Sequence, residues 1–269
     1  AGNGTDNKNR ILFGTGYKKI LDSLPDVTVT PGSVFYKPEG HYFFKRQLPD
    51  RDIFFHFDAA PLGFLSIAAH GHADALSFIM HINGQPLFID SGTYTYHTEP
   101  AWRQYFIGTL AHNTVRINNH NQASSGGPTM WLNHFRITDA ALATDGNIER
   151  VSAEHDGYKN DGVVHRREIT FNKTEGSFII RDDIILKKKQ EVKVEIPFHI
   201  HPSVSVVEKD KSLYSLENSN IPAVLFLADE KLNQRLVKGQ TSPEILGWYS
   251  ASFMKKVPAY VIYCYTNIK

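Results

Sequence analysis

The sequence contains a single cysteine, Cys264, among 269 residues, which excludes an internal disulfide framework. The residues around it, YVIYCYTN, are typical of a strand, so we expect this thiol to be a small core side chain rather than a nucleophile. A low cysteine count fits both a cytosolic and a periplasmic protein. The chemistry of the chain must therefore come from other side chains.

Net charge and long apolar runs are also lacking. The 29 Lys and Arg residues nearly balance 28 Asp and Glu residues, and the formal net charge is +1 at pH 7. Without a strong global field, any site for an anion must be local, and we expect no nucleic-acid partner. No apolar run approaches the length of a membrane span, and the first residues, AGNGTDNKNR, do not resemble a signal peptide.

Helical periodicity is scarce. Only residues 17–24, YKKILDSL, have apolar residues three to four positions apart, and Pro25 follows them. The rest of the chain has short runs rich in β-branched and aromatic residues, several of them alternating with a period of two. The predicted strands are residues 41–47, 52–58, 75–82, 86–90, 113–118, 165–171, 177–186, 192–200, 222–228 and 258–266. Predicted turns lie at 83–86, 124–128, 145–147 and 160–162.

Many strands without interleaved helices favour an all-β fold, a large antiparallel β-sandwich. No shift in composition and no repeat marks an internal boundary. We therefore expect one domain over residues 30–269, preceded by a linker with a short helix over residues 1–29. A polar tail followed by one lone helix is what the trailing end of another domain would look like.

The stretch HGHADALSF, residues 70–78, contains the side chains most suited to metal binding or catalysis. If His70 and His72 are extended, both imidazoles point to one side, as metal ligands require. Asp90 ends an apolar strand, where a carboxylate is costly unless it is paired or metal-bound, and His112 opens the next strand. The pattern indicates a metal site, and the alternative is a set of structural polar residues at a turn.

A second group lies in GTYTYHTEPAWRQYF, residues 92–106. Aromatic faces stack on sugars, and Arg is a bidentate partner for carboxylate or sulfate. The alternative is that these aromatic residues pack in a long loop on the sandwich. The other histidines in or beside strands are expected to be structural, hydrogen-bonded residues; these are His56, His81, His199 and His201. The candidate substrate-binding residues are Tyr94, Tyr96, Trp102 and Arg103, and Tyr105 belongs to the same segment.

Taken together, the motifs HGHADALSF, GQPLFIDSGTYTY, WRQYF and AHNTVRIN resemble the heparinase II/III-like family of polysaccharide lyases. The resemblance continues through HDGY (155–158), HRREITF (165–171) and GWYSASFMKKVPA (247–259). It implies an N-terminal α/α toroid followed by a β-sandwich, of which this chain matches the second part. The helix at 17–24 would then be a remnant of the toroid or its linker.

The resemblance also implies roles for residues. His70 would line the catalytic cleft, and Tyr105 lies where some relatives place a cleft tyrosine. His72, Asp90 and His112 would bind a structural zinc ion. The family's catalytic tyrosine and its binder of the uronate carboxylate would come from the toroid.

The implied reaction is β-elimination in a uronic-acid-containing polysaccharide. A base removes the proton at C5, a donor stabilises the enolate-like state, and an acid protonates the leaving oxygen. Half of the cleft would be missing, so we expect the isolated domain to be inactive. The alternatives are a non-catalytic polysaccharide-binding or scaffold domain in cell-surface polymer assembly and a zinc hydrolase. The substrate and oligomeric state stay open, and the family implies the periplasm or cell envelope.

Overall fold

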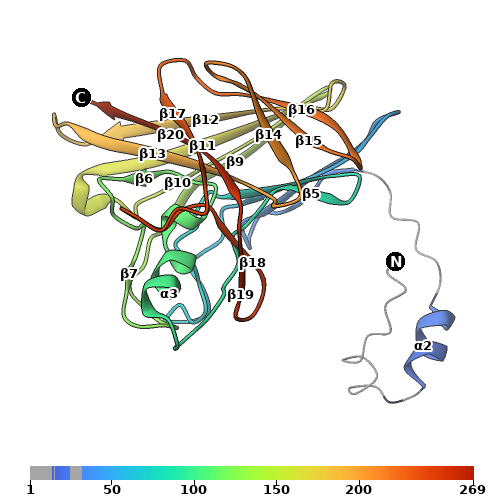
Figure 1. Ribbon diagram of the computed structural model, residues 1–269, viewed down its shortest axis with the longest axis horizontal. Helices are drawn as coiled ribbons and strands as arrows, with labels where there is room; N and C mark the ends of the chain where they lie inside the picture. Colours follow the sequence, from blue (N-terminus) through green and yellow to red (C-terminus); the bar gives the residue numbers. More distant parts are fainter. Residues whose placement is uncertain (1–13, 15, 25–31) are drawn as a thin grey trace. The chain divides into compact units, whose positions relative to one another are not determined.

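The computed structural model describes residues 14, 16–24 and 32–269 (Figure 1). The chain divides into two units, residues 1–31 and 32–269. The described part of the first unit contains helix α2, Tyr17–Ser23, which confirms the predicted helix. Pro25 and the linker residues 1–13, 15 and 26–29 lie outside the described residues. Within the described ranges, no helix has the length and apolar character needed to cross a membrane.

The largest sheet of the second unit has nine antiparallel strands. Eight of them follow the order β1-β2-β3-β4-β5-β13-β20-β17, and β6 pairs with β13. Their bounds are β1 Val34–Tyr36, β2 His41–Gln47, β3 Asp52–Asp58, β4 Phe78–Ile82, β5 Gln85–Phe88, β6 Arg116–Ile117, β13 Val192–Ile200, β17 Asn233–Lys238 and β20 Tyr260–Ile268. Cys264 is buried on β20, as the sequence predicts.

Four smaller antiparallel sheets accompany the nine-stranded sheet. The first has four strands in the order β12-β11-β10-β9, and the second has three strands in the order β14-β15-β16. Their bounds are β9 Ile137–Asp145, β10 Ile148–His155, β11 Val163–Asn172, β12 Ser177–Leu186, β14 Ser205–Asp210, β15 Leu213–Asn218 and β16 Ile221–Leu227. Two hairpins complete the set: β7 Ser124–Ser125 with β8 Trp131–Asn133, and β18 Trp248–Ser252 with β19 Lys255–Pro258.

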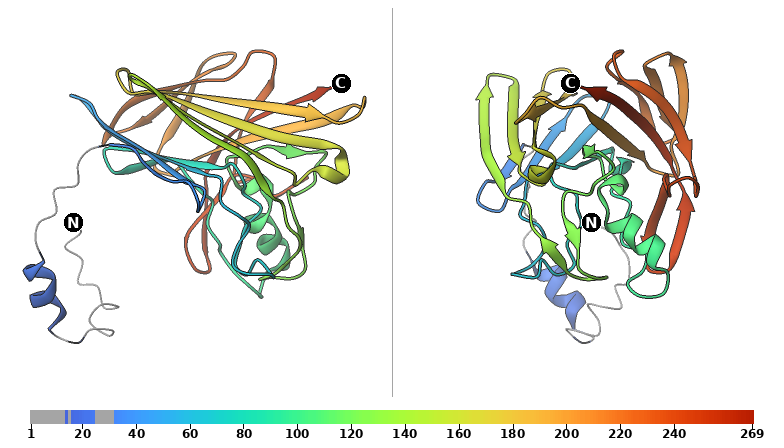
Figure 2. Two further views of the ribbon diagram at one scale, coloured as in Figure 1. Left: turned by 180° about the vertical axis from the view of Figure 1, so that it is seen from behind. Right: turned by 90° about the vertical axis from the view of Figure 1, so that its left-hand side faces the viewer.

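The core lies between the nine-stranded sheet and the two larger of the smaller sheets (Figure 2). Alternation along the strands points one face of each inward, which is why Phe55 on β3 stacks on Phe178 of β12, with ring centroids 4.3 Å apart. Farther across the same sheet, Phe198 of β13 contacts Phe226 of β16, with ring centroids 4.8 Å apart. Both smaller sheets therefore cover the same face, and the predicted all-β antiparallel sandwich is confirmed.

The structure differs from the sequence expectations in three places. The alternative that residues 92–106 form one long loop does not hold, because helix α3, Pro100–Ile107, begins within them with Pro at its first turn and is followed by the short 3₁₀ helix η1, Thr109–Ala111. Several strands were not predicted, namely β1, β7–β10, β14, β15 and β17–β19; of these, β9 is mostly exposed and lacks an apolar face. Predicted strands 75–82 and 113–118 are shorter than expected because their ends belong to the loops described next.

Candidate metal centre and cleft

The candidate site is built from the loops that join β3 to β4, β5 to α3, and η1 to β6. In Figure 1, α3 and the hairpin β18–β19 lie together at one end of this unit, below the long strands. A loop from the β7–β8 hairpin braces the first of these loops, because the Trp131 indole N–H donates to the Gly71 carbonyl at 2.9 Å. The fold thus brings together residues that are distant in the sequence, since Gly71 and Trp131 are 60 positions apart.

The HGH motif lies in a turn. His70 has φ 59°, in the left-handed region, and its N–H donates to the Thr129 carbonyl at 3.3 Å. Gly71 has no room for a side chain, because a Cβ there would lie 2.8 Å from backbone atoms of Gly63. The prediction that extended backbone turns both imidazoles to one side was therefore wrong. His70 is exposed, whereas His72 is half-buried and makes different contacts.

His72, Asp74, Asp90 and His112 form one cluster. One nitrogen or oxygen atom from each lies within 4.8 Å of those of the other three. The rings of His72 and His112 have centroids 5.2 Å apart. The structure brings together the three residues predicted as metal ligands and adds Asp74. Two imidazoles and two carboxylates suit zinc or a similar divalent transition metal.

The geometry of His112 and Asp90 tests that fit. His112 Nδ1 lies 2.6 Å from Asp90 Oδ2, which is a hydrogen-bond length. Two ligands of one tetrahedral zinc lie about 3.3 Å apart, so a bound ion requires these atoms to separate by a fraction of an ångström. His112 is fully buried, and within the described residues its Nε2 atom has no hydrogen-bond partner. An unpaired buried nitrogen is costly, and the donor set as a whole fits a cation.

Burial and mutual charge shift the pKa values in the cluster. Burial raises the pKa of Asp74 to about 7, although the charge of His112 opposes this shift. Burial alone would raise the pKa of Asp90, but the charge of His112 and its hydrogen bond lower it well below its usual range. Burial lowers the pKa of His72 to about 4, and the positive charge of His112 adds to the effect. The cluster therefore holds two crowded carboxylates whose repulsion a cation would relieve.

Beside the cluster, the Tyr96 ring contacts both His70 and Arg103. The His70 and Tyr96 rings meet edge to face with centroids 5.7 Å apart, and the guanidinium carbon of Arg103 lies 4.5 Å from the Tyr96 centroid. Arg103 is only 2% exposed, and its Nε donates to the Pro128 carbonyl at 2.8 Å. Its Nη1 atom has no hydrogen-bond partner in the described chain. The stack combines an exposed imidazole, a phenol ring and a spare guanidinium donor.

Tyr94, Trp102 and Tyr105 lie in an aromatic cluster between α3 and the β18–β19 hairpin. The Lys256 ammonium lies 4.0 Å from the Tyr94 ring centroid and 4.3 Å from that of Trp102. The Tyr105 hydroxyl accepts a hydrogen bond from the Trp248 N–H at 3.4 Å, and burial raises the pKa of Tyr105 to about 12. These contacts hold α3 in place. The substrate-binding and catalytic roles assigned to these residues stay predictions.

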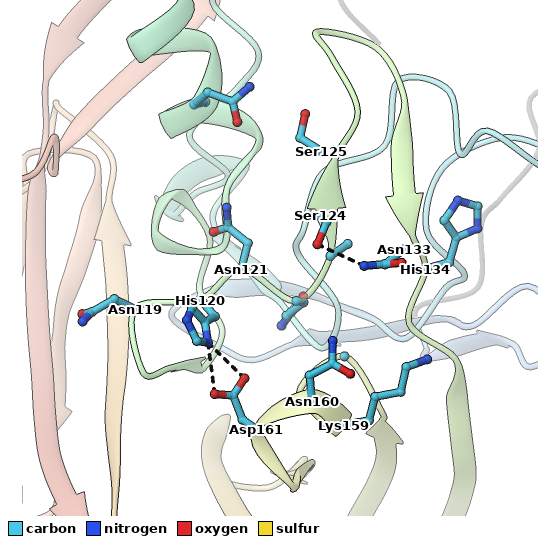
Figure 3. A pocket seen from close by; sticks show the side chains of 14 residues that line it. Asn119, His120, Asn121, Ser124, Ser125, Asn133, His134, Lys159, Asn160 and Asp161 are labelled. Carbon is cyan, nitrogen blue, oxygen red and sulfur yellow. Dashed lines mark hydrogen bonds and ion pairs between the residues drawn. The ribbon is translucent and has the colours of Figure 1, made fainter.

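A polar cavity of about 490 Å³ lies among the end of α3, the β7–β8 hairpin and the 3₁₀ helix η2, Lys159–Asp161 (Figure 3). Its lining includes four asparagines, two histidines and a lysine; they are Asn119, Asn121, Asn133, Asn160, His120, His134 and Lys159. His120 Nδ1 lies 3.0 Å from Asp161 Oδ1 at its edge. The described residues that line it include none of the predicted site residues, because its scattered amides form no motif in the sequence.

Comparison with known proteins decides the family. The family model described as "Heparinase II/III-like, C-terminal" matches residues 30–262, which include every predicted site residue and all of the sandwich except the end of β20. The chain belongs to the heparinase II/III-like C-terminal family.

Two curated relatives of this heparinase II/III-like chain are both named heparin-sulfate lyase. The protein from Bacteroides stercoris is 25% identical over 195 residues, which are 70% of this chain and 25% of the relative. The protein from Bacteroides thetaiotaomicron is 30% identical over 110 residues, 40% of this chain and 14% of the relative. The chain thus spans a quarter or less of the length of these relatives.

Solved structures agree on the heparinase fold. The heparan sulfate lyase HepC from Pedobacter heparinus superimposes with a TM-score of 0.71 at 15% identity, over 98% of this chain and 38% of that chain. A crystal structure of heparinase III gives a TM-score of 0.68 at 18% identity, over 96% and 42% of the two chains. At these identities the similarity establishes the β-sandwich fold alone.

Of two further residues that support the heparinase-family site, Asn113 was not singled out from the sequence, and Asp74 was noted only as the carboxylate within HGHADALSF. Asn113 is buried, and its Nδ2 donates to the carbonyls of Phe78 and Ile89 at 2.8 and 3.0 Å, which fixes the residue beside His112. Asp74 follows His72 by two residues, and this spacing is the one signal that pointed to it. The packing around Asn113 is not visible in the sequence, because its partners lie on other strands.

Proposed function

We propose that this chain is the β-sandwich part of a lyase that cleaves uronate-containing polysaccharide by β-elimination. The observation that carries the proposal is the exposed His70 in contact with the Tyr96–Arg103 stack, in a member of the heparinase II/III-like family. The names of the two curated relatives support a sulfated, uronate-containing substrate. An N-terminal α/α toroid would supply the rest of the active site, and we assign the protein to the periplasm or cell envelope.

The chemistry suits these side chains. In β-elimination the C5–H bond breaks, its electrons form the C4–C5 double bond, and the C4–O bond breaks as the leaving oxygen takes up a proton. The uronate carboxylate resists the second negative charge that develops, so a cationic donor must stabilise it. His70 would move a proton at C5 or at the leaving oxygen. Arg103, whose guanidinium carbon lies 4.5 Å from the Tyr96 centroid, would hold that ring in position and add positive charge beside a carboxylate or sulfate group of the substrate.

The metal cluster would stabilise the loops that position His70. His72, Asp90 and His112, together with Asp74, would hold a zinc ion. Such an ion supplies divalent charge that ties separate loops together. Because His72 is two residues from His70, the chain's own turn at residues 70–72 would carry that rigidity to the cleft imidazole.

The surface beside His70 also suits a neighbouring domain. Phe64 and Leu65, in the same loop as His70, are 67% and 73% exposed, and Ile67 is exposed as well. Phe253 is exposed and lies close to Tyr96, with ring centroids 6.3 Å apart. Exposed apolar side chains gathered in this way mark interaction surfaces. We assign this surface to the α/α toroid.

The test uses the full-length protein and the chain of 269 residues in parallel. Heparan sulfate, heparin, alginate and a bacterial exopolysaccharide are offered, and unsaturated product is followed by its near-ultraviolet absorbance. The full-length protein is expected to form the product, and His70→Ala to slow it by about a hundredfold or more. His201→Ala, a histidine outside the site, serves as the control. The isolated chain is expected to have negligible activity.

A full-length protein that forms no unsaturated product from any of these polymers would overturn the lyase assignment. A second candidate, polysaccharide binding without catalysis, is favoured by the amide-lined cavity of Figure 3. It predicts binding without product and loss of binding in Lys159→Ala. A zinc hydrolase would instead release saturated product, with chemistry that stops when the metal is removed while the fold survives.

A further inference from the structure

A second group of metal-binding side chains lies on the outward face of β2 and β3. His41 and Asp58 are directly opposed in the antiparallel register, and His56 lies two residues before Asp58. Residues two apart on a strand share a face, and the alternate residues Phe55 and Phe57 point into the core. One nitrogen or oxygen atom from each of the three polar side chains lies within 4.8 Å of the other two.

The distances match those between ligands of one ion. His41 Nδ1 lies 3.1 Å from His56 Nε2 and 3.7 Å from Asp58 Oδ1. Ligands of a tetrahedral zinc, with bonds of about 2.0–2.1 Å, lie about 3.3 Å apart. The two distances bracket this value, so an ion can enter with small side-chain movements. We propose that His41, His56 and Asp58 form a second site for zinc or a similar divalent transition metal, with water completing the coordination.

Neighbouring groups already orient these ligands. Asp58 Oδ1 accepts a hydrogen bond from the Ala60 N–H at 2.8 Å. The His56 ring stacks on Phe43 with centroids 4.5 Å apart and an angle of 14° between planes. Outer contacts of this kind restrict ligand motion before the ion arrives.

The site is open to solvent and shares no residue with the first cluster. The side chains of His41 and Asp58 are 38% and 31% exposed, so an ion and its waters can reach them. The four residues of the first cluster are all different from these three. With three protein ligands and partial exposure, the second site is expected to release its ion more readily. The proposal does not depend on lyase activity, because it rests on the outward face of two strands.

The test counts zinc in variants of the chain. The His72→Ala variant, which weakens the first cluster, is dialysed against micromolar free zinc, and bound metal is measured by elemental analysis. About one zinc per chain is expected, and adding His56→Ala should weaken its binding by about tenfold or more, because a ligand is lost. Adding His81→Ala instead is the matched control, since His81 lies on β4 and outside the group.

A second variant guards against misfolding. His56→Phe keeps a ring on Phe43 but removes both nitrogens, so it should lose zinc to the same extent while retaining the circular dichroism of the parent. Zinc binding that is unchanged by both His56 variants, or absent from the His72→Ala chain that remains folded, would overturn the proposal. Loss of zinc in the His56 variants, with zinc retained in the His81→Ala control, supports the proposal. This outcome is independent of whether the full-length protein cleaves polysaccharide.

Discussion

Arg167 on β11 donates a hydrogen bond to the backbone carbonyl of Asn113, the residue that follows His112. The same guanidinium donates to the Leu76 carbonyl at 2.8 Å and pairs with Asp182 at 2.7 Å. Leu76 and Asn113 belong to the two loops that carry His72 and His112. The fully buried Arg167 thus ties both loops to the four-stranded sheet β12-β11-β10-β9.

Arg167→Met should lower the free energy of unfolding by about 3–5 kcal/mol, because it removes the cation that pairs with the largely buried Asp182 carboxylate and leaves His165 as the remaining side-chain partner. Urea unfolding measures the change. Arg181→Met is the matched control: Arg181 pairs with Asp183 in the same sheet but is 69% exposed, and its loss should cost about 1 kcal/mol or less. Equal losses in the two variants would contradict the assignment of Arg167 as an anchor.

Stability should fall as the pH drops below about 6.5, the ordinary pKa of histidine. Burial lowers the pKa of His155, and the charge of His165 adds to this effect. Burial also lowers the pKa of His165, although Asp182 opposes it. Below pH 6.5 these histidines are therefore protonated in the unfolded chain but not in the folded chain. Each of them lowers the free energy of unfolding by about 1.4 kcal/mol per pH unit until the pH reaches its pKa in the folded state.

The comparison that isolates this effect is urea unfolding at pH 7.5 and 5.5 for the parent, His155→Gln and His201→Gln. His155→Gln should lose less stability between the two pH values than the parent, whatever its stability at pH 7.5. His201→Gln changes a more exposed ring and should keep most of the parent's pH dependence. Identical pH dependence in all three proteins would show that His155 protonates readily in the folded state.

Gly92→Ala should damage the metal cluster. Gly92 has φ +86°, its N–H donates to Asp90 Oδ1 at 2.8 Å, and an added Cβ would overlap the Ser250 carbonyl oxygen. Gly84→Ala is the control, with φ +72° and no atom within 4 Å of an added Cβ, so it should cost about 1–2 kcal/mol from backbone conformation alone. Gly92→Ala should cost more in urea unfolding, and a smaller loss than Gly84→Ala would contradict this account.

Removal of metal should destabilise the fold more than any single surface change. If the first cluster holds zinc, a chelator lowers the melting temperature, because binding at a thousand times the Kd contributes about 4 kcal/mol. Differential scanning calorimetry with and without chelator measures this. The effect should shrink in His72→Ala and persist in His97→Ala, which changes an exposed histidine outside the cluster. A chelator effect of equal size in His72→Ala would place the stabilising ion elsewhere.

Several elements follow from local sequence alone. The alternating runs at 41–47 and 52–58 form β2 and β3 with the predicted bounds, because their odd or even positions are large apolar residues that need one buried face. Asn83 and Gly84 both have positive φ in the two-residue turn between β4 and β5, as their residue types predict. Helix α3 escaped prediction because eight residues, half of them aromatic or Pro, carry little helical periodicity.

The sequence by itself determined the class of fold, the strand faces and the side chains available for chemistry, since these depend on residue type and spacing along the chain. Only the tertiary structure decided that Asp74 joins His72, Asp90 and His112, that His70 turns away from them, and that His41 faces Asp58. Those relationships depend on strand register and on loops braced by distant partners such as Trp131. The local sequence does not specify which distant segment packs against a given strand or loop, so these relationships are determined by tertiary packing.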